Sequence, residues 1–255
     1  MNACQTQAEW DKMAAAYEEF TAGEDSYSNR IEWPCIQKML PALQGKDIID
    51  LGCGSGRFSF LLEKEKPHTI TGIDISPAML KIAEKHKDAL DSQAQFFQGD
   101  ICHMATDHQY DLVFSSTVFH YIQELAPLFA RIAALLKPHG QCIISQLHPV
   151  YTAQYPIARE GHFPDDEEWN VRYLDKNLRG YIQPWIEYND DVSNFLSYSY
   201  HHTLSDYFQA ITRSGLTITD MAEPMPPRDW QEKYPGRYEA FIETPSYLIL
   251  KLQKA

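Results

Sequence analysis

The chain has 255 residues, which suits one large domain or one domain with an insertion. Its 35 acidic and 22 basic residues give a formal net charge of −13, which would repel a phosphate polymer, and no local basic patch offsets it. No apolar run approaches the roughly 18 residues of a membrane span, and the first residues lack the pattern of a secretory signal. The five cysteines are widely spaced without a Cys-x-x-Cys pair, so we expect a cytoplasmic protein without a metal site or disulfide framework.

Short apolar runs and helical segments alternate along most of the chain. The first 45 residues, with EWDKMAAAYEEF, predict a helical N-terminal segment. The runs DIID, HTITGIDI, AQFFQGDI, YDLVFSST and QCIISQLH predict five strands. Helices are predicted over SGRFSFLLEKE, over LAPLFARIAALLKPHG, and from Ser76-Pro77, where serine caps the helix and proline opens it. This alternation predicts parallel strands with right-handed crossovers, helices on both faces, and a ligand site at the carboxyl ends of the strands.

The alternation stops between residues 151 and 200. This stretch is rich in aromatic and acidic residues, has no clear period, and is too long for an ordinary loop. We predict an insertion that folds over the strand ends as a substrate lid. The segments TLSDYFQAITRSGL, LTITDMAEP and SYLILKLQK then predict one more helix and two strands. The expected organisation is one domain with a helical N-terminal segment (1–45), a core (46–150 and 201–255) and a lid (151–200).

The turn after the first strand, LGCGSGR, carries three glycines in the spacing G-x-G-x-G. Such a turn could be a tight turn without a ligand, a nicotinamide or flavin site, or an S-adenosylmethionine site. A dinucleotide site usually has G-x-G-x-x-G, and here Arg57 stands where the third glycine would fall. Asp74 ends the second strand, where a carboxylate can accept hydrogen bonds from ribose hydroxyls, and Asp100 ends the third, where it can accept the adenine amino group. The glycine turn, followed in order by Asp74 and Asp100, favours an S-adenosylmethionine site.

At these positions the sequence resembles the class I S-adenosylmethionine-dependent methyltransferases. DLGCGSG, GIDISPAML, GDI and YDLVFSSTVFHYI are similar to their first four motifs, over about Ile48 to Ser145. A weaker likeness in IEWP, HP and EPMP points to a bacterial small-molecule subgroup similar to the type 11 methyltransferases. The resemblance implies a Rossmann-like, doubly wound α/β fold whose seven-stranded sheet has its last strand antiparallel. It also implies S-adenosylmethionine as cofactor, S-adenosylhomocysteine as product, and no metal.

The resemblance further implies a set of cofactor-binding residues. Asp50 and the glycines would lie at the methionine and ribose end, Asp74 at the ribose, and Met79 against the adenine. A phenylalanine and a serine of the fourth strand would back the sulfonium group, and Tyr17 would close over the methionine. The set is Tyr17, Asp50, Gly52, Gly54, Gly56, Asp74, Ile75, Met79, Asp100, Ile101, Phe114 and Ser115.

The acceptor is less well defined by the sequence. Transfer of a methyl group from a sulfonium mainly needs alignment and the exclusion of water, and an oxygen acceptor also needs a base. His148 and His120 follow predicted strands and are candidates for that base, although capping or packing roles remain open for both. Candidate substrate contacts are Tyr121, Trp169, Tyr173 and His201, with packing as the alternative.

The expected acceptor is a small molecule. Relatives that methylate nucleic-acid bases or glutamine side chains often carry an Asn/Asp-Pro-Pro-Tyr run in the fourth motif, and this chain has Phe-Ser-Ser-Thr there. Together with the net charge, this disfavours nucleic acid, and a tRNA-modifying enzyme remains an alternative. A protein that binds S-adenosylmethionine without catalysis is another. We expect a monomer or a homodimer.

Overall fold

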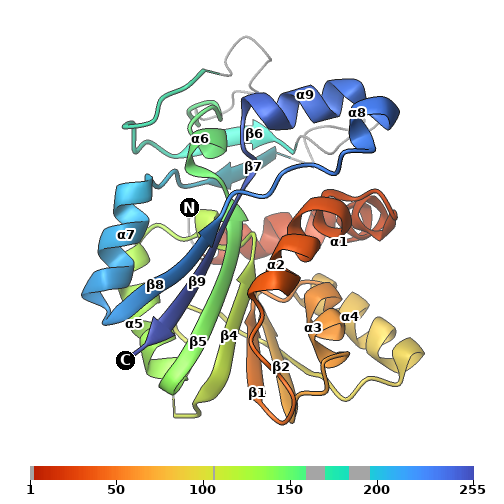
Figure 1. The fold of residues 1–255 in the computed structure, drawn as a ribbon, viewed down its shortest axis with the longest axis vertical. Coiled ribbons are helices and arrows are strands. Elements are labelled where there is room, and N and C mark those ends of the chain that lie inside the picture. Colours follow the sequence, from red (N-terminus) through yellow and green to blue (C-terminus); the bar gives the residue numbers. More distant parts are fainter. Residues whose placement is uncertain (1–2, 106, 159–169, 184–195) are drawn as a thin grey trace.

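The computed structural model describes residues 3–105, 107–158, 170–183 and 196–255 (Figure 1). Seven strands form one sheet in the order β3-β2-β1-β4-β5-β9-β8. Strand β9 runs antiparallel to both of its neighbours, and the other strand pairs are parallel. The predicted Rossmann-like fold class is therefore confirmed. The strands are β1 (Asp47–Leu51), β2 (Thr69–Asp74), β3 (Gln95–Gln98), β4 (Tyr110–Ser116), β5 (Leu136–Leu147), β8 (Leu216–Ala222) and β9 (Tyr247–Lys254).

Helices cover both faces of this sheet (Figure 1). On one face, α2 (Trp33–Met39) and α3 (Arg57–Glu63) bury apolar side chains against β1 and β4, and α4 (Pro77–Leu90) lies beside α3. On the other face, α5 (Leu125–Leu135) and α7 (Leu204–Arg213) pack on the sheet and on each other. The predicted cap of α4 is present, because the Ser76 hydroxyl accepts from the N–H of Met79 at 3.2 Å.

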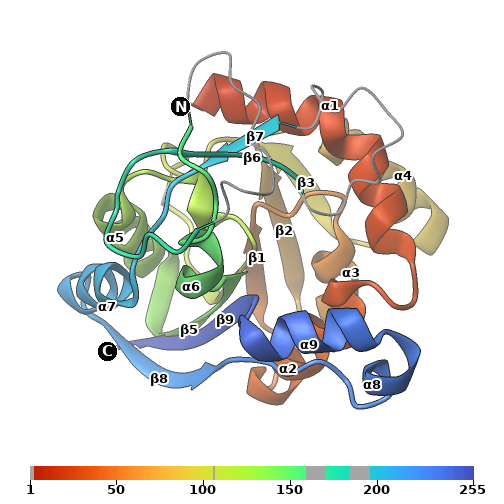
Figure 2. The same cartoon turned by 90° about the horizontal axis from the view of Figure 1, so that it is seen from above.

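A third group of elements lies over the carboxyl ends of the strands, as Figure 2 shows from above. It contains α1 (Ala3–Ala22), the short helix α6 (Pro149–Thr152), and a hairpin of β6 (Arg179–Ile182) and β7 (Leu196–Ser199). The hairpin contacts α1 directly: the Ser197 hydroxyl lies 3.6 Å from Met13 Sδ, and the N–H of Tyr198 donates to Glu9 at 3.4 Å. The hairpin falls within the stretch for which the sequence predicts no regular elements.

The segment after β8 holds two helices that the sequence analysis did not predict, α8 (Trp230–Lys233) and α9 (Pro235–Glu243). They pack against the N-terminal segment through a cluster formed by Ile31, Trp230, Phe241 and Tyr247. The π-helical turn η1 (Ser28–Glu32) leads from this cluster directly into α2. Within the described residues, no helix is both long and apolar enough to cross a membrane.

Candidate active site

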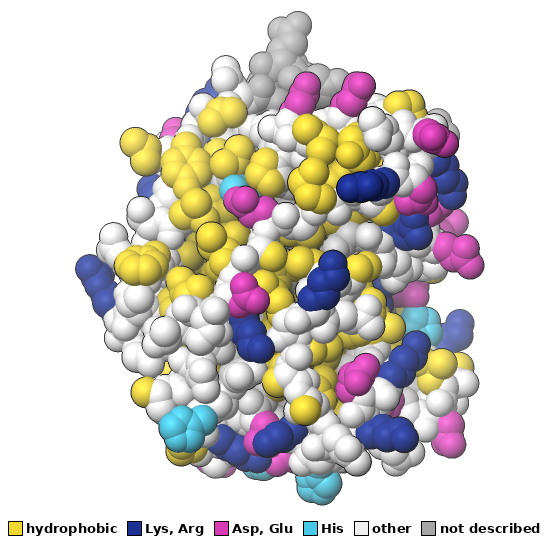
Figure 3. All heavy atoms as spheres, viewed as in Figure 1, with side chains coloured by type: hydrophobic (Ala, Val, Ile, Leu, Met, Phe, Trp, Pro, Cys, Tyr) yellow, Lys and Arg dark blue, Asp and Glu magenta, His cyan; other side chains and the backbone are white. Residues whose placement is uncertain are grey.

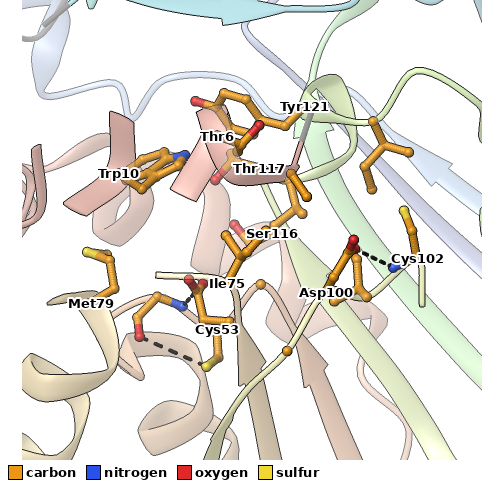
Figure 4. A pocket seen from close by; sticks show the side chains of 18 of the residues that line it. Thr6, Trp10, Cys53, Ile75, Met79, Asp100, Cys102, Ser116, Thr117 and Tyr121 are labelled. Carbon is orange, nitrogen blue, oxygen red and sulfur yellow. Dashed lines mark hydrogen bonds between the residues drawn. The ribbon is translucent and has the colours of Figure 1, made fainter. Parts of the chain in front are cut away.

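A cavity of about 520 Å³ lies at the carboxyl ends of β3, β2, β1 and β4 (Figure 4). These strands are neighbours in the sheet, so the residues that follow them meet along one edge. Nine of the twelve predicted cofactor-binding residues line the cavity. They are Tyr17, Asp50, Gly52, Gly54, Asp74, Ile75, Met79, Asp100 and Ile101.

Gly52 and Gly54 expose bare backbone in the turn between β1 and α3. Their φ angles are +73° and +53°, which glycine adopts without the steric cost that a side chain brings. An added Cβ would lie 2.3 Å from Val118 Cγ2 at Gly52 and 2.9 Å from Met79 Cε at Gly54. The N–H of Gly54 donates to Asp74 Oδ2 at 2.8 Å and so ties this turn to the end of β2. Val118 and Met79 occupy the space that side chains would need here, and the backbone of both glycines forms part of the cavity wall.

Two buried carboxyl groups, Asp50 and Asp74, lie next to this turn. Asp74 also accepts from the N–H of Ser76 at 2.8 Å, and Asp50 accepts from the hydroxyl of Ser59 at 2.6 Å. Burial raises the pKa of Asp74, against the hydrogen bonds from the backbone. Burial also raises the pKa of Asp50 to about 7, and the nearby charge of Asp74 adds to that increase. The pair suits a ligand that brings hydroxyl groups and a positive charge.

At the other end of the cavity, Asp100 follows β3. Its Oδ1 accepts from the N–H of Cys102 at 2.8 Å, and its Oδ2 lies 2.7 Å from His103 Nδ1. Ile101 is buried beside it, and Met79 reaches the cavity from α4. Figure 4 shows Asp100 and Cys102 on one side of the cavity and Met79 on the other. This end therefore combines a carboxylate with apolar walls.

Aromatic side chains roof the cavity. Trp10 packs edge-to-face on Tyr17 and on Tyr121, with ring centroids 5.1 and 5.8 Å apart. The side chains of Tyr17 and Thr117 share a hydrogen bond, and burial raises the pKa of Tyr17 to about 12. The roof thus combines apolar surface with a neutral phenol. Tyr121, predicted as a substrate contact, lines the cavity here.

Three predicted cofactor-binding residues do not line the cavity. Phe114 is fully buried against α2 and α3, with its ring 5.5 Å from that of Phe58. Ser115 is also buried and donates its hydroxyl to the carbonyl oxygen of Leu51 at 2.7 Å. Gly56 caps α3 with φ +79°, where an added Cβ would meet the ring of Phe60. These residues support the site from behind.

Neither candidate base lies in the cavity wall. His148 caps α6, because its Nδ1 accepts from the N–H of Val150 at 3.1 Å and its Nε2 lies 2.9 Å from Glu223. His120 is buried behind Tyr121, and burial lowers its pKa to about 3. His148 thus has the geometry of a capping residue, and His120 packs behind Tyr121.

The remaining substrate candidates lie elsewhere. His201 hydrogen-bonds through both ring nitrogens, to the hydroxyl of Thr152 and the carbonyl oxygen of Tyr173, each at 2.8 Å. The hydroxyl of Tyr173 accepts from the N–H of Leu204 at 3.0 Å. Tyr173 and His201 thus contact each other and lie outside the wall of this cavity. Trp169 lies outside the described residues.

Several residues of the site were missed by the sequence analysis. Ser116 and Thr117 line the cavity where Phe114 and Ser115 were expected. Thr117 has φ +54°, an uncommon conformation for a β-branched residue. Ser116 donates its hydroxyl to Glu32, which is fully buried. No motif in the sequence marks this last contact, since the two residues are far apart in the chain.

The family model of the methyltransferase domain matches residues 43–196, more than half of the chain. The protein is a class I S-adenosylmethionine-dependent methyltransferase. This methyltransferase is 33% identical to a trans-aconitate 2-methyltransferase of Escherichia coli over 77% of this chain and 76% of that one. It is 26% identical to a malonyl-[acyl-carrier protein] O-methyltransferase of Halalkalibacterium halodurans over 78% of each chain.

Among solved structures, the methyltransferase resembles an S-adenosylmethionine-dependent methyltransferase of Mesorhizobium loti with a TM-score of 0.70 and 26% sequence identity. That likeness covers 88% of this chain and 97% of the other. The family therefore implies S-adenosylmethionine as cofactor. The predictions of the family and of the enzyme class are confirmed.

Proposed function

We propose that the protein transfers the methyl group of S-adenosylmethionine to a small-molecule acceptor by in-line displacement. The observation that carries this proposal is the single cavity in which the glycine turn, Asp74 and Asp100 follow one another along the strand ends beneath an aromatic roof. When bound, the cofactor supplies a methyl group on a positively charged sulfur. The protein's own contribution is alignment and the exclusion of water.

The residues present fit the cofactor. Each oxygen of the Asp74 carboxylate accepts one backbone N–H, which leaves lone pairs for two ribose hydroxyls. Asp100, Ile101 and Met79 line the cavity, where the carboxylate of Asp100 and the N–H of Ile101 would serve the adenine edge and Met79 would offer an apolar surface. Gly52 and Gly54 line the cavity, and their backbone would border the chain that joins ribose to methionine. Asp50, which also lines the cavity, would receive the ammonium group of that methionine.

The acceptor enters, in this proposal, beneath the roof formed by Trp10, Tyr17 and Tyr121. These side chains favour a small acceptor with an apolar or planar part. The candidate histidine bases lie outside the cavity wall, which favours a nucleophile that arrives deprotonated, as a carboxylate or a neutral amine does. The names of the two relatives, trans-aconitate and malonyl-[acyl-carrier protein] methyltransferase, support a carboxylate.

Surface charge gives no support for a nucleic-acid acceptor. The net charge is −13, and on the face seen in Figure 3 the lysine and arginine side chains are scattered among acidic ones. A polyanion is held by several neighbouring cations, and it would be repelled by the chain as a whole.

The test combines binding and turnover. Titration calorimetry with S-adenosylmethionine, S-adenosylhomocysteine and NAD should give binding for the first two alone. Incubation with methyl-labelled donor should then label a small molecule in a metabolite extract, with trans-aconitate as a first defined acceptor and total tRNA as a comparison. The proposal fails if NAD binds in place of the methyl donor, if tRNA is the labelled fraction, or if binding occurs without any labelled product.

A further inference from the structure

The buried carboxyl group of Glu32 has no place in the function described so far. Glu32 ends the π-helical turn η1, an uncommon element that is frequent at functional sites, and its side chain is 0% exposed. Its Oε1 accepts the hydroxyl of Ser116, whereas Oε2 has no hydrogen-bond partner among the described residues. A buried carboxylate that is half satisfied is costly, so it needs a compensating charge.

The protein itself supplies little positive charge to compensate the Glu32 carboxylate. The charged or titratable groups that face Glu32 are Tyr17 of α1, Arg57 of α3 and Tyr247 of β9. Arg57 directs its hydrogen bonds to the carbonyl oxygen of Thr21 and the hydroxyl of Ser26 instead of to Glu32.

Burial raises the pKa of Glu32, and the hydroxyl groups near it oppose this increase. The hydroxyls of Ser28 and Ser145 lie close enough to lower the pKa of Glu32, but neither is hydrogen-bonded to Oε2. Glu32 therefore keeps a free oxygen next to the cavity wall.

The missing positive charge has a natural source, and here the argument rests on the proposed function. If adenine lies at the end of β3 and ribose at the end of β2, the strand order brings the sulfur to the ends of β1 and β4. Ser116 ends β4, Thr117 follows it, and both line the cavity at that place (Figure 4). Because Ser116 donates its proton to Glu32, its oxygen presents only lone pairs to the cavity, the polarity that suits a cation.

We propose that Glu32, acting through Ser116, is the countercharge that makes this site prefer the cationic methyl donor over its neutral product. S-adenosylmethionine carries a positive sulfur that S-adenosylhomocysteine lacks. The interaction is therefore made with the donor and lost after transfer. Glu32 is thus a specificity-determining, positioning residue that holds the donor and weakens the hold on the product.

The test measures the dissociation constants of both ligands by calorimetry at pH 8. In Glu32→Gln, which keeps an acceptor for the Ser116 hydroxyl, S-adenosylmethionine should bind about tenfold more weakly, and S-adenosylhomocysteine should change less than about twofold. Glu32→Asp, which keeps the charge, should retain the wild-type ratio of the two constants. Asp111→Asn, near the opposite end of β4, is the matched control for the loss of one carboxylate and should leave the ratio unchanged.

A second variant guards against misfolding. Ser116→Ala removes the hydrogen bond that the Ser116 hydroxyl donates to the Glu32 carboxylate, and it should also weaken binding of the methyl donor selectively. Equal weakening of both ligands in the two variants, or an unchanged ratio, overturns the proposal, because Glu32 would then serve the fold or a group that both ligands share. Failure of the wild-type protein to bind either ligand would instead contradict the proposed function.

Discussion

Replacing Asp50 by asparagine should make the protein more stable and a weaker ligand binder. Asp50 is 2% exposed, and its carboxylate accepts the hydroxyl of Ser59. Burial raises its pKa from 3.8 to about 7, against this hydrogen bond, and the charge of Asp74 adds to the increase. Asparagine cannot ionise but still offers an oxygen to Ser59, so the substitution removes the charge alone.

The magnitude follows from the shift in pKa. Three units at about 1.4 kcal/mol each correspond to about 4 kcal/mol. Because the pKa is raised in the folded state, the contribution of Asp50 to stability is fully present below the unfolded pKa, near pH 4, and is lost as the pH rises to about 7. The asparagine variant should therefore be more stable than the wild type by about 4 kcal/mol at pH 8, and by less than about 2 kcal/mol at pH 5.

Urea unfolding followed by tryptophan fluorescence at both pH values gives this difference, with Asp107→Asn at an exposed position as the control. In calorimetry at pH 8, Asp50→Asn should weaken the binding of both S-adenosylmethionine and S-adenosylhomocysteine by about tenfold. Both ligands carry the ammonium group, and the variant loses a charge-assisted hydrogen bond to it. A stability difference that is the same at pH 5 and pH 8 would refute the assignment of a raised pKa to Asp50. Full affinity in the variant would refute its place at the ammonium group.

Three further outcomes are expected. Asp74→Ala should weaken binding of both ligands at least tenfold, because a charge-assisted hydrogen bond contributes about 1.5–3 kcal/mol. Unchanged dissociation constants in calorimetry would contradict the assignment of Asp74 to the ribose site. Gly54→Ala should fold with a lower melting temperature and bind either ligand more weakly. The reason is that Gly54 has φ +53° and that the added methyl would lie 2.9 Å from the flexible end of Met79. Undiminished affinity would contradict this expectation. S-adenosylhomocysteine should slow hydrogen exchange in α1, β6 and β7 more than in β5, and equal protection with and without ligand would mean that this roof is fixed.

Much of the fold and of the cavity floor could be predicted from the sequence because both depend on local rules. The strands are apolar runs, the Ser-Pro pair predicts the cap at Ser76, Asp74 ends β2 as expected, and Asp100 follows the end of β3. Parallel topology then brings these strand ends to one edge, whatever the details of packing. The sequence therefore predicts that Gly52, Gly54, Asp74 and Asp100 lie close together, and all four line the cavity.

Other parts of the site depend on geometry that no local rule contains. The side chains of a strand alternate between faces, but the left-handed conformation of Thr117 ends that alternation, so Ser116 and Thr117 both line the cavity and Ser115 does not. His148 lies at the end of β5 as predicted, yet its ring turns to cap α6. The contact between Glu32 and Ser116 joins two segments far apart in the chain.

The division between floor and roof bears on how the acceptor is chosen. The floor comes from one continuous part of the chain, from β1 to the end of β4, and holds the features that suit a common methyl donor. The roof comes from α1 with Tyr121 behind it, and α1 is tied to the hairpin by the bond from the N–H of Tyr198 to Glu9. Burial raises the pKa of Glu9 to about 7, so this tie gains or loses a charge near neutral pH. Because α1 is also joined to the floor through Asp11, which accepts the hydroxyl of Ser76 at 2.6 Å, a change of charge at Glu9 acts on the contact between the roof and the hairpin.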